Sequence, residues 1–436
     1  MKMHDKKLLR KSLSGRGKLK GARQVAVVCL LALGAATSVQ AGSVEQAKRM
    51  HDRLASIPPN EEMLCAMNIE IGTNTDPAAA ARLVLQTSTI DAAAYPGCDV
   101  NGNSRIDNDA SKKAFYSTSL KDFFTPWSNV EKTTHAPLND MTATLIGMVR
   151  DGVPFNTALT ANLVYTGSNT SNFSIQNNNH YESLEANGAD LSTELTSRTQ
   201  SGMSMPGEGA GVFTTRAAGE AYLSAGTNRR MVDHMLTAFT CYGLLASNQE
   251  LKDVTRTTDR IRQDVTRSPG GDSSIYLNSC SGCHAGLDPL AGALAYYNWD
   301  DANGQVEYTP GSVQPKMLIN ATTFKAGYIT EDNGWLNYWR EGQNAEMNWG
   351  WNTAGGVPGT GEVVASGNGL VSLGQEILST QAFTQCQVER VYKHVCLQDP
   401  VDTHASAIQT LANNFGTSGY DMRDIFAGVA PLCMGN

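Results

Sequence analysis

The chain contains one C-x-x-C-H motif, formed by Cys280, Cys283 and His284. This spacing is the attachment signature of c-type haem. Two thiols on one turn of helix can form thioethers with the two vinyl groups of one porphyrin, and the next residue then lies under the iron as its proximal ligand. We therefore predict a covalently bound haem c at these three residues.

Two other interpretations of the motif are less well supported. A redox-active C-x-x-C pair needs a preceding strand in a βαβ context, whereas residues 273–278, SSIYLN, are typical of a capped helical turn. A structural zinc site needs further ligands, usually from a second closely spaced pair. The sequence shows no such pair, so haem is favoured over a redox disulfide or zinc.

The sixth ligand of the iron would decide the chemistry of the haem. Methionine suits electron transfer, whereas an open position permits ligand binding or peroxide chemistry. Downstream candidates are Met317 and Met347. Met347 lies among four of the six tryptophans, between Trp335 and Trp351, where sulfur can pack against rings beside a haem. The same cluster also suits an ordinary core. The remaining candidates are an open position or one of three histidines, His234, His394 and His404.

A second candidate site is a calcium loop that begins at Asp99. It matches the first nine positions of such a loop, with oxygen ligands at positions 1, 3, 5 and 9 and an apolar residue at position 8. Ser104 replaces the usual glycine at position 6, and Ala110 replaces the usual glutamate at position 12. The alternative is a polar turn rich in Asn and Asp. A calcium ion there would brace the loop beside Cys98. The candidate residues are Asp99, Asn101, Asn103, Arg105 and Asp107.

Residues 1–41 are predicted to be a secretory signal peptide. Nine basic side chains and one acidic side chain precede an uncharged apolar run from Val25 to Ala36, and a small-x-small cleavage signal follows at residues 39–41. The run is shorter than the ~20 residues of a membrane span. An uncleaved N-terminal anchor is the alternative. We expect a periplasmic or secreted protein with no membrane span in the mature chain.

The charge balance narrows the choice of partners. Without residues 1–41 the chain has 25 basic and 41 acidic residues, a net charge of −16. This argues against nucleic acid and anionic membrane surfaces as partners. It favours a redox partner protein with a basic docking surface.

Six of the nine cysteines lie outside both the motif and the signal peptide. An exported chain with an even number of such residues is expected to form disulfides, here three. Sequence alone leaves 15 connectivities open. Cys65 with Cys98 is the first expectation because both flank one short segment, and Cys386 with Cys396 and Cys241 with Cys433 complete the set. The alternative is that some of these cysteines are buried free thiols.

The elements that position these residues are predicted to be mainly α-helical, with long irregular connections and few short strands. Capping residues and apolar periodicity predict helices over 43–57, 77–86, 139–152, 227–243 and 250–265. A turn-rich stretch at 267–274 is the clearest boundary. It separates a helical N-terminal module, 42–266, from a cytochrome-c-like helical haem module, 267–436.

Residues 280–300, CSGCHAGLDPLAGALAYYNWD, resemble a group of largely uncharacterised exported bacterial proteins. In that group a cytochrome-c-like C-x-x-C-H is followed by a block like DPxGxALExFD. The chain is similar to the group in two further patches, 149–167 and 383–430. The resemblance implies haem binding at the motif and implies no substrate. The residues that match the block are Asp288, Pro289, Gly292, Ala293, Leu294 and Asp300.

These features favour an exported monohaem c-type cytochrome that transfers electrons. Two alternatives stay open. One is a haem enzyme with an open sixth site, of the peroxidase or oxidase kind, because one haem needs only about a hundred residues of cover. The other is a secreted binding protein braced by calcium. The sequence carries no G-x-S-x-G, P-loop, H-E-x-x-H or dinucleotide fingerprint.

Overall fold

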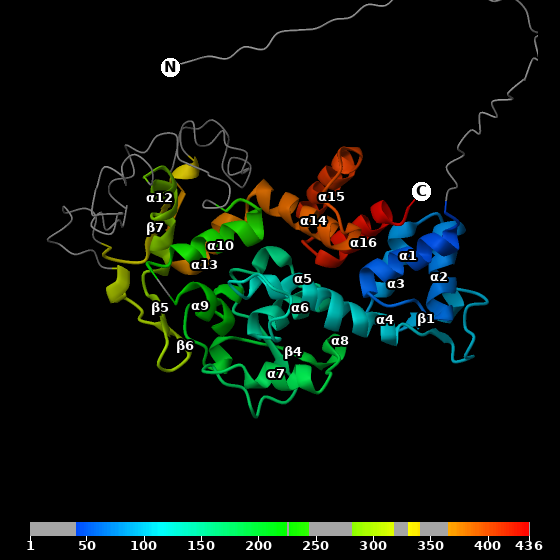
Figure 1. The fold of residues 1–436 in the computed structure, drawn as a ribbon, viewed down its shortest axis with the longest axis horizontal. Coiled ribbons are helices and arrows are strands. Elements are labelled where there is room, and N and C mark those ends of the chain that lie inside the picture. Colours follow the sequence, from blue (N-terminus) through cyan, green and yellow to red (C-terminus); the bar gives the residue numbers. More distant parts are fainter. Residues whose placement is uncertain (1–40, 225, 244–280, 318–329, 341–364, 436) are drawn as a thin grey trace, which may run out of the picture. The chain divides into compact units, whose positions relative to one another are not determined.

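The computed structural model describes residues 41–224, 226–243, 281–317, 330–340 and 365–435 (Figure 1). Within them the chain is mainly helical, as the sequence predicts, with short antiparallel strand pairs. The predicted signal peptide (except residue 41), the predicted helix over 250–265 and the predicted boundary at 267–274 lie outside the described residues.

The described helices form two groups along the chain, one before residue 243 and one after residue 280. The helices before residue 243 are α1 (Ser43–Ala55), α2 (Glu61–Gly72), α3 (Pro77–Leu85), α4 (Asp109–Ala114), α5 (Leu120–Phe124), α6 (Asp140–Asp151), α7 (Asn179–Ala186), α8 (Leu191–Glu194), α9 (Arg216–Tyr222) and α10 (Arg229–Thr240). Those after residue 280 are α12 (Ser281–Leu287), α13 (Gly369–Leu378), α14 (Gln381–Cys396), α15 (Ala405–Thr417) and α16 (Met422–Val429).

The strands among the described residues form two-stranded antiparallel pairs, each between neighbours in the chain. The first two pairs are β1 (Ile90–Asp91) with β2 (Arg105–Ile106) and β3 (Val164–Gly167) with β4 (Leu195–Arg198). The other two are β5 (Tyr297–Asp300) with β6 (Gln305–Tyr308) and β7 (Gly334–Asn337) with β8 (Ala365–Asn368).

Local capping signals set where several helices begin. The carboxylate of Asp76 accepts a hydrogen bond from a backbone N–H of α3 at 2.9 Å, and the side chain of Asn139 does the same for α6 at 3.0 Å. Both predicted helices are therefore confirmed with their caps. The cap predicted at Ser43 is wrong by one residue, because Gly42 is the N-cap of α1. The Ser43 hydroxyl instead donates to Asn68 Oδ1 of α2 at 2.6 Å.

An aromatic cluster forms the centre of the core. The ring of Phe155 lies 6.1 Å from that of Phe239 on α10 and 6.4 Å from that of Phe383 on α14. Trp127 lies 5.3 Å from Phe239, and all four rings are nearly or fully buried. Segments that lie far apart in the sequence therefore share one core.

Elements on both sides of the predicted boundary pack together. Residues 40–436 form one compact unit, in which α16 packs against α3 and α14 packs against α10. Glu208 adds a further link, because its carboxylate accepts hydrogen bonds from the Tyr308 hydroxyl at 3.2 Å and from Leu370 N, at the start of α13, at 3.0 Å. The two predicted modules thus share extensive contacts.

Three disulfides link the described elements: Cys65–Cys98, Cys241–Cys386 and Cys396–Cys433. The predicted Cys65–Cys98 pair is confirmed. The predicted pairs Cys386–Cys396 and Cys241–Cys433 are wrong. Cys386 and Cys396 both lie on α14, and ten residues of helix separate their Cα atoms by about 15 Å, whereas a disulfide needs a separation below about 7 Å.

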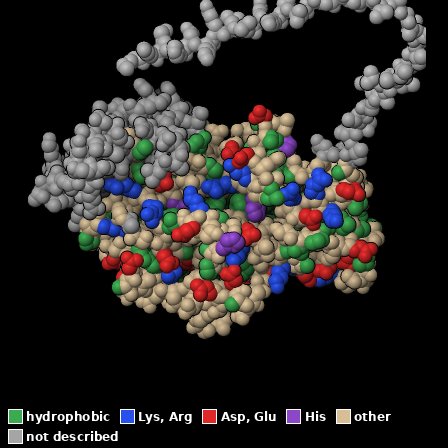
Figure 2. Space-filling model, in the orientation of Figure 1, with side chains coloured by type: hydrophobic (Ala, Val, Ile, Leu, Met, Phe, Trp, Pro, Cys, Tyr) green, Lys and Arg blue, Asp and Glu red, His purple; other side chains and the backbone are tan. Residues whose placement is uncertain are grey.

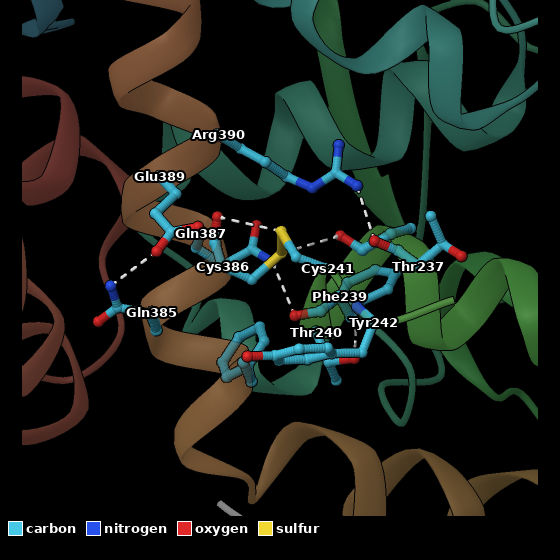
Figure 3. The surroundings of a disulfide bond; sticks show 12 residues. Thr237, Phe239, Thr240, Cys241, Tyr242, Gln385, Cys386, Gln387, Glu389 and Arg390 are labelled. Atoms are coloured by element: carbon cyan, nitrogen blue, oxygen red, sulfur yellow. Dashed lines mark hydrogen bonds between the residues drawn. A yellow bond between two sulfur atoms is a disulfide. The ribbon is translucent and has the colours of Figure 1, made fainter. Parts of the chain in front are cut away.

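The Cys241–Cys386 bond joins the C-terminal end of α10 to α14 (Figure 3). Hydrogen bonds support it on both sides: Gln387 Nε2 donates to the carbonyl of Phe239 at 3.1 Å, and Arg390 donates to the carbonyl of Thr237 at 2.7 Å. Covalent and polar links therefore fix α10 against α14.

Candidate functional site

The C-x-x-C-H motif lies at the start of α12, which carries Cys283 and His284 next to each other on one helical segment. Cys280 lies outside the described residues. Cys283 is half-buried. The helical turn that thioether attachment requires is thus present at the second cysteine and the histidine.

The indole of Trp339 supports one side of α12. Its ring N–H donates to the carbonyl of Gly286 at 3.2 Å, and the side chain is fully buried. A Cβ atom at Gly286 would lie 2.4 Å from Trp339 Cζ2, so only glycine fits beneath the ring. The tryptophan therefore holds α12 at Gly286.

A polar network fixes Trp339 in turn. Asn337 Oδ1 accepts from the Trp339 backbone N–H at 3.0 Å. Arg340 forms two bonds to the carboxylate of Glu376 on α13, at 2.5 Å and 2.7 Å, and Asn337 Nδ2 donates to the same carboxylate at 2.7 Å. Paired arginine–carboxylate bonds of this kind are strong and directional, so the support under α12 is rigid.

The end of α12 is tied to α10. Asp288 is fully buried, and its carboxylate pairs with the Arg229 guanidinium at 2.6 Å. Beside it, the Asn228 amide donates to the carbonyls of Leu294 and Tyr297, both at 2.9 Å. Asp288 and Leu294 belong to the block that resembles the exported bacterial group. Their surroundings give these two positions a structural role, which is to hold the helix that bears the motif.

The tryptophan cluster is partly described. Trp335 on β7 is buried and its indole N–H donates to Ser372 on α13 at 2.7 Å. The next backbone N–H, of Leu336, donates to the carbonyl of Pro289 just after α12 at 3.3 Å. The β7 strand therefore lies against the segment that follows α12, and an aromatic shell around a haem stays a prediction. Met347 and the last two tryptophans of the cluster lie outside the described residues.

Met317, the other methionine candidate, is buried in a short 3₁₀ turn at residues 315–317. The turn is attached on both sides: Gln314 N donates to the carbonyl of Ala295 at 2.8 Å, and Lys316 Nζ donates to that of Leu223 at 2.7 Å. Burial lowers the pKa of Lys316 to about 8. Met317 as an iron ligand stays a prediction.

His234 is buried on α10 and stacks on Tyr222, with ring centroids 3.8 Å apart. Its Nε2 atom has no hydrogen-bond partner among the described residues, and the carbonyl of Trp127 accepts from the other ring nitrogen. Burial lowers the pKa of His234 to about 3, helped by the charges of Arg390 and Lys132. His234 lies about 140° around α10 from Arg229, the residue that meets the end of α12. His234 and Arg229 therefore lie on different sides of α10.

The other two candidate histidines have partners elsewhere. His394 Nε2 hydrogen-bonds with Ser119 Oγ at 3.0 Å, and burial lowers its pKa to about 4. His404 Nδ1 hydrogen-bonds with the Tyr392 hydroxyl at 2.7 Å. His394 thus joins α14 to the segment before α5, whereas His404 has its partner within the C-terminal helices.

The predicted calcium loop is folded as a tight polar turn. The carboxylate of Asp99 accepts hydrogen bonds from the backbone N–H groups of Asn103 and Ser104, at 3.1 Å and 2.8 Å. Ser104 has φ +63°, the left-handed conformation for which such loops usually use glycine. The Arg105 guanidinium lies 2.6 Å from Asp109 Oδ2 and 3.7 Å from Asp107 Oδ1, so protein charge already neutralises part of this cluster.

Glu62 on α2 is a feature of this loop that sequence reasoning missed. It is buried, and its carboxylate accepts from the backbone N–H and the side-chain amide of Asn101, at 3.1 Å and 2.7 Å, and from Asp107 N at 2.7 Å. No pattern in the sequence marks Glu62 for this role, because the contact joins residues far apart in the chain. Glu62 braces the loop from α2, and calcium binding there stays a prediction.

The described residues lack both a further metal-binding group and a membrane-spanning helix. They contain no group of three or more His, Cys, Asp or Glu side chains that could hold a metal ion. None of the helices there has both the length and the apolar character needed to cross a bilayer.

Comparison with known proteins gives no relative. No known family model, no curated protein and no solved structure matches the chain. Functional assignment therefore depends on the motif and its surroundings.

Proposed function

We propose that the chain is an exported monohaem c-type cytochrome-like protein, which transfers electrons through a haem bound covalently at Cys280, Cys283 and His284. The observation that carries this proposal is the position of the motif. Cys283 and His284 lie on a short helix that the Trp339 indole contacts at Gly286 and that the Asp288–Arg229 ion pair fixes at its end. A fixed helix keeps the proximal imidazole in one geometry, as a redox centre requires.

The roles of the motif residues follow from their chemistry. The two thiols supply the thioether attachment and the His284 imidazole supplies the proximal ligand, while the haem, when bound, supplies reversible one-electron chemistry. All six cysteines outside the motif and the predicted signal peptide pair with one another. They therefore do not compete with the motif for the porphyrin during export.

The acidic balance of the chain suggests the kind of redox partner. Acidic side chains gather over α7 and the β5–β6 pair in the face shown in Figure 2, while basic side chains are interspersed elsewhere on it. A net charge of −16 without residues 1–41 would steer a basic partner toward the protein. We propose a basic redox partner whose association weakens as salt rises.

The test is haem attachment in protein exported from a host with a c-type haem attachment system. The Cys280→Ala, Cys283→Ala double variant is expected to lose haem staining of the denatured band, together with the tetrapyrrole mass in mass spectrometry. The matched control is the Cys65→Ala, Cys98→Ala double variant, which also loses two cysteines but keeps the motif and is expected to keep its stain. A stained band from the motif variant would contradict the proposal.

The sixth position separates a carrier from the alternative, a haem enzyme of the peroxidase or oxidase kind. His394 and His404 have hydrogen-bond partners, so the candidates that we keep are Met317, Met347, His234 and an open position. A low-spin spectrum that carries the near-infrared methionine–iron band, and that is lost in Met317→Ala or in Met347→Ala, supports the carrier. A high-spin spectrum that shifts with cyanide in the unmodified protein supports the enzyme.

A further inference from the structure

A cleft of about 380 Å³ lies between α3, α15 and α16. Helix α16 packs against both α3 and α15, and in Figure 1 these three helices lie at the opposite side of the 40–436 unit from α12. The cleft is therefore separate from the proposed haem site. Its size falls in the range of small-molecule sites, about 300–1,000 Å³.

The floor of the cleft is apolar. Leu411 and Ala78 are half-buried and present apolar surface to the cleft, and the fully buried Phe415 and Ile425 pack behind them. Gly428 also lines the cleft, and the absence of a side chain there matters. A Cβ at Gly428 would lie 2.3 Å from Leu411 Cδ2, so any larger residue would displace the wall.

The rim of the cleft carries one positive and one negative charge. Arg82 and Asp424 face each other at 3.2 Å, with side chains 53% and 40% exposed. An exposed pair of this kind contributes only about 0–1 kcal/mol of stability, so a ligand can re-pair both groups at little cost. The Asn414 amide and the Ser418 hydroxyl, also on the rim, make no hydrogen bond to the described residues.

We propose that this cleft binds an α-amino acid with an apolar side chain. The ligand carboxylate pairs with the Arg82 guanidinium, which suits two-bond contact with a carboxylate. The ligand ammonium pairs with Asp424, and the apolar side chain lies on Leu411 and Ala78. Asn414 and Ser418 supply hydrogen bonds to the polar end.

The charge pattern of the rim selects this class of ligand. An anion such as a phosphate would be opposed by Asp424, and a simple cation would be opposed by Arg82. A zwitterion carries both charges within a few ångströms, which matches the 3.2 Å separation of the two rim groups. The apolar floor then favours a side chain such as that of leucine or phenylalanine, because burial of apolar surface there stabilises the complex.

The test is calorimetric titration of the exported protein with L-leucine and L-phenylalanine. Saturable binding is expected for at least one of them. N-acetyl-L-leucine lacks the ammonium group and L-leucine methyl ester lacks the carboxylate, so both are expected to bind at least tenfold more weakly than L-leucine. No heat with either amino acid up to 10 mM, or equal binding of the acetylated analogue, would overturn the proposal.

Variants locate the site. Arg82→Gln and Asp424→Asn are each expected to weaken binding at least tenfold, and Ala78→Leu to abolish it by filling the cleft. The matched control is Lys393→Gln, which breaks another exposed ion pair, Lys393–Asp399 at 2.8 Å, away from the cleft. If Asp424→Asn fails to fold, Ser418→Val replaces it, because that exposed hydroxyl has no structural partner among the described residues. Unchanged affinity in the rim variants overturns the proposal.

Discussion

The buried histidine of α10 makes the fold sensitive to acid. His234 is 7% exposed, with Tyr222 stacked on its ring and the Trp127 carbonyl on one ring nitrogen. The neighbouring charges of Arg390 and Lys132 also oppose a proton on it. The folded protein therefore holds this imidazole neutral, whereas the unfolded chain exposes it to water.

The size of the effect follows from the two pKa values. The pKa of His234 is about 3 in the folded protein and 6.5 in the unfolded chain. Between these values the unfolded chain binds more protons, so the free energy of unfolding falls as the pH falls below 6.5. In this range the free energy of unfolding falls by about 1.4 kcal/mol for each unit by which the pH falls. At pH 4.5 the loss from His234 alone is about 3 kcal/mol, which is a large share of a typical stability of about 5–15 kcal/mol.

The assay is urea unfolding, followed by far-ultraviolet circular dichroism, at pH 4.5, 5.5, 6.5 and 7.5. The His234→Phe variant keeps a ring against Tyr222 but has no group that takes up a proton. Its free energy of unfolding is expected to depend less on pH than that of the unmodified protein, by about 1.4 kcal/mol per unit between pH 4.5 and 5.5. His135→Gln, at an exposed position, is the matched control and should keep the original slope.

The slope, and not the absolute stability, decides the outcome. His234→Phe leaves the Trp127 carbonyl without its donor, so a general loss of about 1–3 kcal/mol at every pH is compatible with the reasoning. His234→Gln tests the same slope with a side chain that can still donate. Parallel curves for His234→Phe and the unmodified protein would show that this histidine is not held neutral in the fold.

Four further predictions concern the motif helix, the polar loop and the disulfides. Gly286→Ala places a Cβ against Trp339, so it is expected to lower both the melting temperature and the haem content per polypeptide. The haem content is measured by the pyridine haemochrome spectrum, and an unchanged value would contradict the supporting role of the ring. Glu62→Gln weakens three hydrogen bonds to the polar loop and is expected to cost about 2 kcal/mol in urea unfolding, and no loss would show that the loop does not depend on this carboxylate. Calcium binding at the same loop is tested by thermal melting. Addition of 2 mM calcium chloride is expected to raise the melting temperature of the unmodified protein but not that of the Asp99→Ala variant. Equal melting curves of the unmodified protein with calcium and with EDTA would exclude calcium binding. The Cys241→Ala, Cys386→Ala double variant opens a loop of 145 residues and is expected to lower the free energy of unfolding by about 4 kcal/mol. Non-reducing peptide mapping that finds either cysteine in another disulfide would refute the pairing.

Features that depend on neighbouring residues could be predicted from the sequence. The caps at Asp76 and Asn139 and the mainly helical character depend on side chains within a few positions of the helix start. The disulfide pairing was predicted correctly only for Cys65–Cys98, because this pair flanks one short segment of the chain. The helix that carries Cys386 and Cys396 would have excluded the pairing of these two, since its rise holds them too far apart.

The candidate site also combines local features, which the sequence shows, with tertiary contacts, which it does not. The motif at Cys280, Cys283 and His284 is local and was predicted directly from its spacing. The contact between Trp339 and Gly286 joins residues 53 positions apart, and no periodicity or cap in the sequence points to it. Glu62 and the polar loop are likewise joined through a tertiary contact that only the folded chain defines.

The contacts around α12 explain why so long a chain carries one motif. Arg229, from upstream of the predicted boundary, holds the end of α12, while Trp339, from downstream, holds its flank. The Cys241–Cys386 disulfide then fixes α10, which bears Arg229, to the C-terminal helices. The N-terminal helices are therefore part of the support of the motif helix. A fragment that begins after residue 266 would lose Arg229 and leave the Asp288 carboxylate buried without this partner, which costs several kcal/mol. We expect such a fragment to be less soluble and to take up less haem per polypeptide than a chain that keeps the upstream helices. Equal haem content in the two would show that the upstream helices serve another purpose.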